Sequence, residues 1–266
     1  MVFSPGRLLL WVIALLPPAV SKGDDAQQFV QRTVQNELVN DRADHSLWIF
    51  LDTDRKDGRS VKQWVAAARD GSLTRVIAVN GEPVSENEQR QKMESFLRDS
   101  SAQARQRKSD QHDDQQATEM LNLLPQAFVW TREGEKDNCT LLHFKPNPQF
   151  RPPDFQARVF AAMEGDMAVD NQQLRIASLK GRLIRDVKIL GGFLASLYAG
   201  GTFDVERRPT GNGVWQITET HVHINGHALL FKSISEQEDD VKTEFKPLPA
   251  NTSMQLAEGE LMAERK

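Results

Sequence analysis

The sequence predicts an α+β fold: a strongly curved antiparallel sheet of about nine to eleven strands, an incomplete barrel, with helices on its concave face. Three observations carry this prediction. Residues 159–246 consist mostly of short segments in which apolar and polar side chains alternate, the pattern of strands wetted on one face. Residues 24–42 instead have the three- and four-residue apolar spacing of a helix. Residues 85–119 mix charge with Gln and Ser and predict two further helices.

Residues 1–21 have the composition of a secretory signal peptide. Arg7 precedes the apolar run Leu8–Leu16, Pro17-Pro18 break the run, and Ala19-Val20-Ser21 offers small residues for cleavage. A run of about nine residues is too short to cross a bilayer of roughly 30 Å, although an uncleaved anchor remains the alternative. We therefore expect an exported protein, periplasmic or secreted, that is soluble after cleavage.

The remaining residues, 22–266, are long enough to form a single domain with one hydrophobic core, into which residues 85–119 are a polar helical insertion. The formal net charge of −4 argues against binding to nucleic acid, which requires cationic neutralisation of phosphates. Cys139 is the only cysteine, so the chain forms no internal disulfide, and we expect a monomer.

The N-terminal third predicts a helix followed by three strands. Phe29, Val30 and Val34 lie on the apolar face of the helix, and Asp24-Asp25 suit its start. The strands are expected at residues 47–51, 61–67 and 73–79, separated by turns that contain Asp57-Gly58 and Asp70-Gly71 and followed by a turn at Asn80-Gly81.

The insertion begins with Ser85-Glu-Asn-Glu88, which fits a capping box. Because residues 85–119 contain few large apolar side chains, both helices are expected to be mostly solvated. The second should end just before Pro125 on an apolar turn that docks on the sheet. Strands at 128–130 and 141–144 follow. A proline-rich connector at 146–153 then leads into the alternating segments of residues 159–246, which we expect to form an antiparallel meander.

The meander starts with a strand from Val159 to Val169, a turn at 170–173 and a return strand from Leu174 to Leu183. Further alternating segments lie around residues 203–206 and 215–218. Asn225-Gly226 predicts a two-residue hairpin turn, after which residues 228–234 run back and 241–246 form another strand.

One apolar segment, residues 189–201, interrupts the meander between two glycine pairs. Phe193 to Ala199 predicts a short helix with hinge-like glycine attachments, either a plug that seals the sheet, a lid over an apolar cavity, or a foot that touches membrane. As a lid it would carry candidate ligand-binding residues opposite the N-terminal helix. The candidate apolar groove therefore comprises Phe29, Val30, Val34, Phe193, Leu194, Leu197 and Tyr198.

Catalytic and metal motifs are not evident. With a turn at Asn225-Gly226, His221 and His223 share one face of a strand while His227 lies on the other, so we expect structural histidines and no metal. The glycine pairs lack the Lys-Ser/Thr of a phosphate loop, and no Gly-x-Ser-x-Gly elbow occurs. We expect no catalytic residues, no cofactor and no enzymatic activity.

The unit Met167–Asp170, Leu174–Ile176 and Leu179–Gly181, with the long N-terminal helix and the meander, resembles the periplasmic lipoprotein carriers and outer-membrane lipoprotein-sorting proteins. The resemblance implies an incomplete antiparallel barrel whose apolar interior shelters acyl chains. It extends to no individual lipid-binding residue, and the polar insertion and the connector at 146–153 depart from the family's pattern.

These observations favour a non-enzymatic periplasmic protein that binds and transports a lipid or the acyl chain of a lipoprotein, because a curled sheet with one apolar face can leave a dry groove. Its expected partners are a lipid or an acylated protein, with transient membrane contact. The alternative is a periplasmic regulatory or protein-interaction module with a filled core, in which the polar helices form the working surface.

Overall fold

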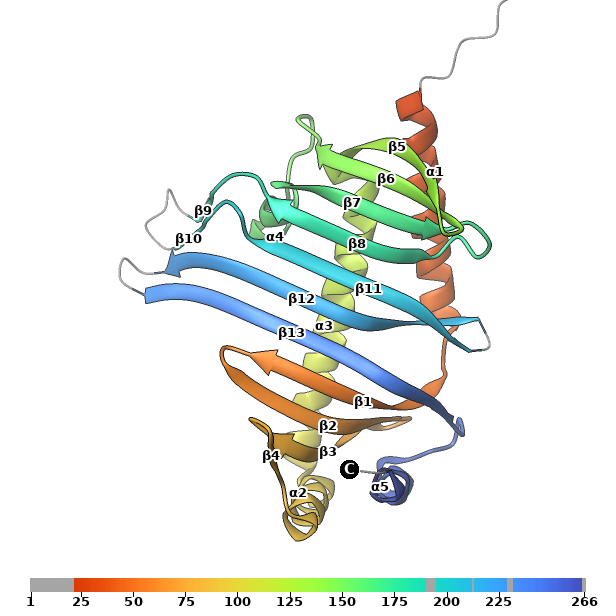
Figure 1. Cartoon of the computed structure of the whole chain (residues 1–266), viewed down its shortest axis with the longest axis vertical. Coiled ribbons are helices and arrows are strands. Elements are labelled where there is room, and N and C mark those ends of the chain that lie inside the picture. The colour runs from red at the N-terminus through yellow and green to blue at the C-terminus, as the bar shows by residue number, and fades with distance from the viewer. Residues whose placement is uncertain (1–21, 190–194, 212, 229–231, 265–266) are drawn as a thin grey trace, which may run out of the picture.

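The structure, a computed structural model, describes residues 22–189, 195–211, 213–228 and 232–264. It is an α+β fold built on one antiparallel sheet, as the sequence predicts (Figure 1). The helices are α1 Lys22–Ala43, α2 Glu86–Arg98, α3 Ser100–Ala127, α4 Phe155–Phe160 and α5 Met254–Ala263. The strands of the N-terminal part are β1 Leu47–Lys56, β2 Arg59–Ala68, β3 Gly71–Val79, β4 Glu82–Pro83, β5 Phe128–Lys136 and β6 Cys139–Pro146. The remaining strands are β7 Met163–Asp170, β8 Ile176–Leu183, β9 Val187–Ile189, β10 Ala195–Leu197, β11 Thr202–Gly211, β12 Val214–Ala228 and β13 Lys232–Leu248.

The described residues form a sheet of 13 strands, which is more than the nine to eleven expected. Its main path runs β4-β3-β2-β1-β13-β12-β11-β8-β7-β6-β5, and the short β9 and β10 lie beside β12. Since β4 and β5 stand at opposite ends of this path, the sheet does not close into a barrel. The pairing of β1 with β13 joins the first and last strands of the chain at the middle of the sheet.

The register assigns residues to the two faces, because directly paired residues of antiparallel strands project to the same side. Met167 pairs with Leu179, Leu179 with Val205, and Val205 with Thr220. We call their side of the sheet the α1 face. Leu51, which pairs with Trp64 and Thr243, lies on the opposite side, which we call the α5 face.

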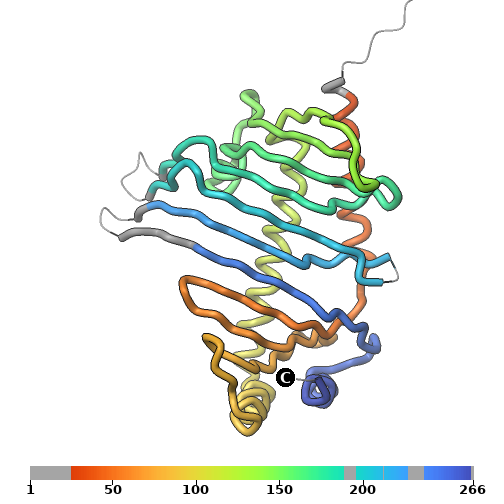
Figure 2. The backbone as a smooth tube through the Cα atoms, in the orientation of Figure 1, coloured from red at the N-terminus to blue at the C-terminus, as the bar shows by residue number. Residues whose placement is uncertain are grey.

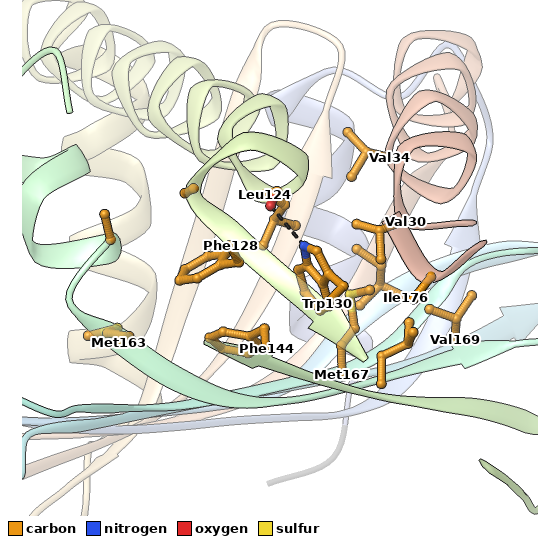
Figure 3. Packing of buried hydrophobic residues seen from close by; sticks show 14 of the residues in the cluster. Val30, Val34, Leu124, Phe128, Trp130, Phe144, Met163, Met167, Val169 and Ile176 are labelled. Carbon is orange, nitrogen blue, oxygen red and sulfur yellow. Dashed lines mark hydrogen bonds between the residues drawn. The ribbon is translucent and has the colours of Figure 1, made fainter. Parts of the chain in front are cut away.

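The buried hydrophobic residues form two clusters. The first core lies on the α1 face under α1, α4 and the C-terminal end of α3 (Figure 3). Its members are Ala26, Phe29, Val30, Val34, Leu124, Ala127, Phe128, Trp130, Leu142, Phe144, Ala161, Ala162, Met163, Met167, Val169, Ile176, Leu183 and Val187. The second core lies on the α5 face at β1–β3, under α2 and α5. Its members are Ile49, Leu51, Trp64, Ala66, Ala68, Leu73, Ile77, Met93, Met254, Ala257 and Leu261. The helices, expected together on one face, are therefore divided between the two.

Helix α3 connects the regions of the two cores. Figure 2 shows it running behind the sheet from the end near β3 to the end near β5. Its first part lies near β3, where Arg107 Nη1 donates to the carbonyl oxygen of Asp70 over 3.2 Å. Residues 107–115 are all exposed, so about two and a half turns of the helix are largely solvated. The solvated helix expected from the sequence is present, but it extends past Pro125 to Ala127 rather than ending before it.

Three expectations of the meander were wrong in detail, and one helix after it was not expected. Val159 lies in α4, and the strand expected from Val159 begins at Met163. Residues 195–197 form strand β10 rather than part of a helix, while 190–194 lie outside the described residues. Asn225-Gly226 is not a turn, since β12 continues through both residues. Helix α5 was not expected at all, although Ser253 caps it and Met254, Ala257 and Leu261 recur at helical spacing.

Candidate functional site

The strongest candidate site is an apolar hollow of about 390 Å³ on the α1 face of the sheet. It opens between the C-terminal part of α3, helix α4 and the strands β7, β8 and β11. Its lining residues are Met120, Phe155, Gln156, Val159, Phe160, Met163, Leu179 and Phe203. Gln156 is the one polar side chain among them, and it is exposed at the rim. Such a surface can bind hydrocarbon but offers no group for acid–base or nucleophilic chemistry.

Helix α4 supplies four of the lining residues and is fixed at both ends. Its N-terminus follows Pro152-Pro153 and is capped by Asp154, whose carboxylate accepts a hydrogen bond from the backbone N–H of Ala157 over 2.7 Å. At its other end the ring of Phe160 packs edge-on against Phe128, with 4.9 Å between centroids. Because Phe128 is fully buried in the first core, this contact holds the wall of the hollow against the sheet.

The C-terminal part of α3 brings Met120 to the hollow. One turn further on, Leu124 is buried, and its carbonyl oxygen accepts a hydrogen bond from Trp130 Nε1 over 3.1 Å (Figure 3). Trp130 in turn packs on Phe144, with 5.2 Å between ring centroids. The apolar turn expected to dock on the sheet therefore does so, and it anchors α3 beside α4.

The floor of the hollow is formed by β7, β8 and β11. Gly165 pairs with Gly181, and Gly181 pairs with Phe203, so three neighbouring strands present glycine, glycine and an aromatic ring in one row. Because Gly181 has no β-carbon, the Phe203 ring lies over it, against the sheet.

The position of α1 depends on a buried ionic group. Glu37 is fully buried, and its two carboxylate oxygens each lie 2.8 Å from an arginine nitrogen, Arg175 Nε and Arg207 Nη1. Glu37 also accepts a hydrogen bond from the backbone N–H of Ile176. A buried carboxylate with these partners fixes α1 against β8 and β11 but does not line the hollow.

Of the groove residues predicted from the sequence, none that the structure describes lines the hollow. Phe29, Val30 and Val34 are buried in the first core, and Arg132 covers the Phe29 ring with its guanidinium 4.9 Å from the centroid. Leu197 is half-buried and packs against the same core, whereas Tyr198 is 44% exposed. Phe193 and Leu194 lie outside the described residues.

None of the residues that line the hollow is among the binding residues predicted from the sequence. A usable signal was present at residues 154–160, where Asp154 after two prolines begins a helix with Phe155 and Val159 on one side. The alternating pattern of the following strand was taken to begin at Val159 rather than at Met163, and this concealed the helix. Phe203 was identified as a strand residue, but its position over Gly181 depends on a pairing between distant segments.

A second, polar hollow of about 500 Å³ lies on the α5 face across β6–β8, β11 and β12. His221 Nδ1 lies 2.6 Å and His223 Nε2 3.2 Å from Asp239 Oδ1, and the contact with Asp239 raises the pKa of His221. The turn expected to place His227 on the other face from His221 and His223 is absent, because β12 continues to Ala228. The side chain of His227 lies outside the described part of the chain. Among the described residues, no group of three or more His, Cys, Asp or Glu side chains is arranged to hold a metal ion.

A group of carboxyl side chains lies on the α1 face where β1 meets β13. Asp52 is 6% exposed and accepts a hydrogen bond from Gln63 Nε2 over 2.8 Å, and Asp240 contacts Lys242 Nζ at 2.5 Å. The Oδ1 atoms of Asp52, Asp54 and Asp240 have no hydrogen-bond partner within the described ranges. Burial, and the neighbouring carboxyl group of Asp240, raise the pKa of Asp52 to about 7.

Cys139 is half-buried and unpaired at the start of β6. Burial raises the pKa of its thiol, and the neighbouring Asp170 and Asp137 add to this effect. Because the thiolate is the reactive form, a raised pKa lowers the reactivity of this residue.

No protein-family model matches the sequence, and no curated protein matches it. One solved structure, that of a DUF1329 family protein from Desulfovibrio piger, aligns with 91% of this chain and 100% of its own, at 11% sequence identity and a TM-score of 0.29. Within the described ranges, no helix combines the length and the hydropathy needed to cross a membrane.

Proposed function

We propose that this protein binds the hydrocarbon chain of a lipid or of a lipoprotein in the apolar hollow and carries it through the periplasm without chemically changing it. The observation that supports the proposal is the lining of the hollow, in which seven apolar side chains surround about 390 Å³. This volume falls within the range of roughly 300–1,000 Å³ typical of small-molecule pockets.

The placement of the hollow also suits a carrier. It lies beside the first core and is bounded by α3 and α4 rather than enclosed within the sheet. A long chain could therefore enter from the side without opening the hydrogen bonds of the sheet. The resemblance of the strand unit at residues 167–181 to lipoprotein carriers adds to this proposal.

The function is tested by extracting the purified protein with organic solvent and identifying released acyl compounds by mass spectrometry. The wild-type protein, produced with its first 21 residues so that it is exported, should release stoichiometric acyl compounds. Val159→Asp places an unpaired charge in the lining and should abolish their retention. The matched control is Val129→Asp, because Val129 is 50% exposed and lies outside the lining.

Two outcomes would contradict the proposal. Wild-type protein that releases no acyl compound, with or without prior incubation with phospholipid vesicles, would favour the interaction module. Equal retention by Val159→Asp and Val129→Asp would show that any bound lipid lies elsewhere.

A further inference from the structure

Gly181 and Phe203 form a cross-strand pair beside the hollow, which Phe203 lines. The two residues face each other directly between β8 and β11. A β-carbon built on Gly181 would lie 2.9 Å from Cζ and 3.1 Å from Cδ1 of Phe203, with Cε1 closer still. Carbon atoms in van der Waals contact are about 3.5–4.0 Å apart, so the ring occupies the space that a side chain at position 181 would fill.

The direction in which the ring would move follows from the register. Gly181 and Phe203 both project to the α1 face, with the sheet backbone behind them. A β-carbon at position 181 therefore pushes the ring away from the sheet, and the hollow lies on that side. Conversely, a smaller side chain at position 203 would leave the glycine floor bare and deepen the hollow.

Gly165 has a different role in the same row. A β-carbon there would collide with the backbone carbonyl of Lys180 on the neighbouring strand and not with a side chain. Backbone atoms cannot rotate away as a ring can, so Gly165 is required for the close approach of β7 and β8. Of the two glycines, only Gly181 affects the hollow through a movable group.

We propose that Phe203, seated on Gly181, sets the depth of the hollow and thereby restricts it to single unbranched hydrocarbon chains, excluding fused ring systems. This inference rests on the proposed function and adds the class of ligand. A volume of about 390 Å³ lies near the lower end of the range for ligand pockets, which suits one chain. Phe203 is thus a specificity-determining residue that contacts the ligand, and Gly181 is a positioning residue that acts through Phe203.

The test compares two fluorescent ligands, the linear polyene cis-parinaric acid and the aromatic N-phenyl-1-naphthylamine. Wild-type protein should bind the linear probe more tightly. Phe203→Leu should shift the affinity ratio toward the aromatic probe by about tenfold, the size of effect that small changes in an apolar pocket produce. Gly181→Ala should weaken the binding of both probes. The double variant Gly181→Ala, Phe203→Leu should recover the lost affinity.

Gly259→Ala is the matched control, because a β-carbon there meets no atom within 4 Å and the residue lies in α5. It should leave both affinities unchanged. If Gly181→Ala does not fold, the ratio of the two probe affinities in Phe203→Leu is by itself the test of the inference.

The outcomes separate the two proposals. If the wild-type protein binds neither probe, the proposed function and this inference both fall. If it binds but the ratio of affinities stays within about twofold in Phe203→Leu, where a tenfold shift is expected, the inference falls and the proposed function stands.

Discussion

Glu37 of α1 and Arg175, the residue before β8, form an ion pair of 2.8 Å that is closed to solvent, with side chains 0% and 7% exposed. The second oxygen of Glu37 lies 2.8 Å from Arg207 of β11. One carboxylate on the N-terminal helix therefore neutralises two arginines from separate segments of the sheet. The helix is fixed in register by charge as well as by its apolar face.

Glu37→Gln should destabilise the protein by about 3–5 kcal/mol, because it leaves two largely buried arginines without their shared partner. The measurement is the free energy of unfolding from urea titrations. Asp41→Asn is the control: Asp41 contacts Arg175 at 3.3 Å but is 49% exposed, so its loss should cost less than about 1 kcal/mol. Equal small losses in both variants would show that the buried pair does not fix α1.

Asp52 should make the protein less stable as the pH rises. Its pKa is raised from 3.8 to about 7, so the folded protein holds this proton more tightly than the unfolded chain. The resulting stabilisation is complete below about pH 3.8 and is lost as the pH rises to about 7.

Asp52→Asn does not titrate, so its free energy of unfolding relative to wild type should increase between pH 4.5 and 7.5, as measured by urea unfolding. Asp239→Asn provides a control of opposite sign. The contact with His221 lowers the pKa of Asp239, so this variant should lose stability relative to wild type as the pH rises through the acid range. A flat difference curve for Asp52→Asn would mean that Asp52 is ionised in the folded protein throughout this range.

The exposed middle of α3 should be helical although only the two ends of the helix pack on the rest of the protein. Gln111 lies within residues 107–115, all of which are exposed. Gln111→Pro should cost about 3 kcal/mol, while Gln111→Ala should be neutral or slightly stabilising. The urea midpoint of each variant gives the comparison. Identical midpoints would show that this stretch is not helical in solution, and the two ends of α3 would then act independently.

The sequence predicted those features that depend on local patterns. Alternation located most of the strands, and Ser85 does cap α2, accepting a hydrogen bond from the backbone N–H of Glu88. The few large apolar side chains of this helix, Met93, Phe96 and Leu97, pack on the second core.

Features that depend on pairing between strands distant in the sequence could not be predicted from local patterns. Asn225-Gly226 has the composition of a hairpin turn, yet Gly226 is paired with both Ile234 and Leu197. A β-carbon at Gly226 would meet the carbonyl oxygen of Ser196, so glycine serves here for the close approach of β10. The same kind of glycine at position 181 seats Phe203, which is why the hollow was not foreseen. Only the fold reveals which use of glycine applies.

Occupation of the hollow by an acyl chain is tested most directly with an environment-sensitive dye at its rim. On a Cys139→Ser background, Gln156→Cys places an acrylodan label at the hollow, and Leu256→Cys places a control label on α5 at a position 59% exposed. Titration with palmitate below its micellar concentration should produce a saturable emission shift at position 156 and none at position 256. An unchanged emission at position 156, or the same shift at both positions, would contradict binding in the hollow.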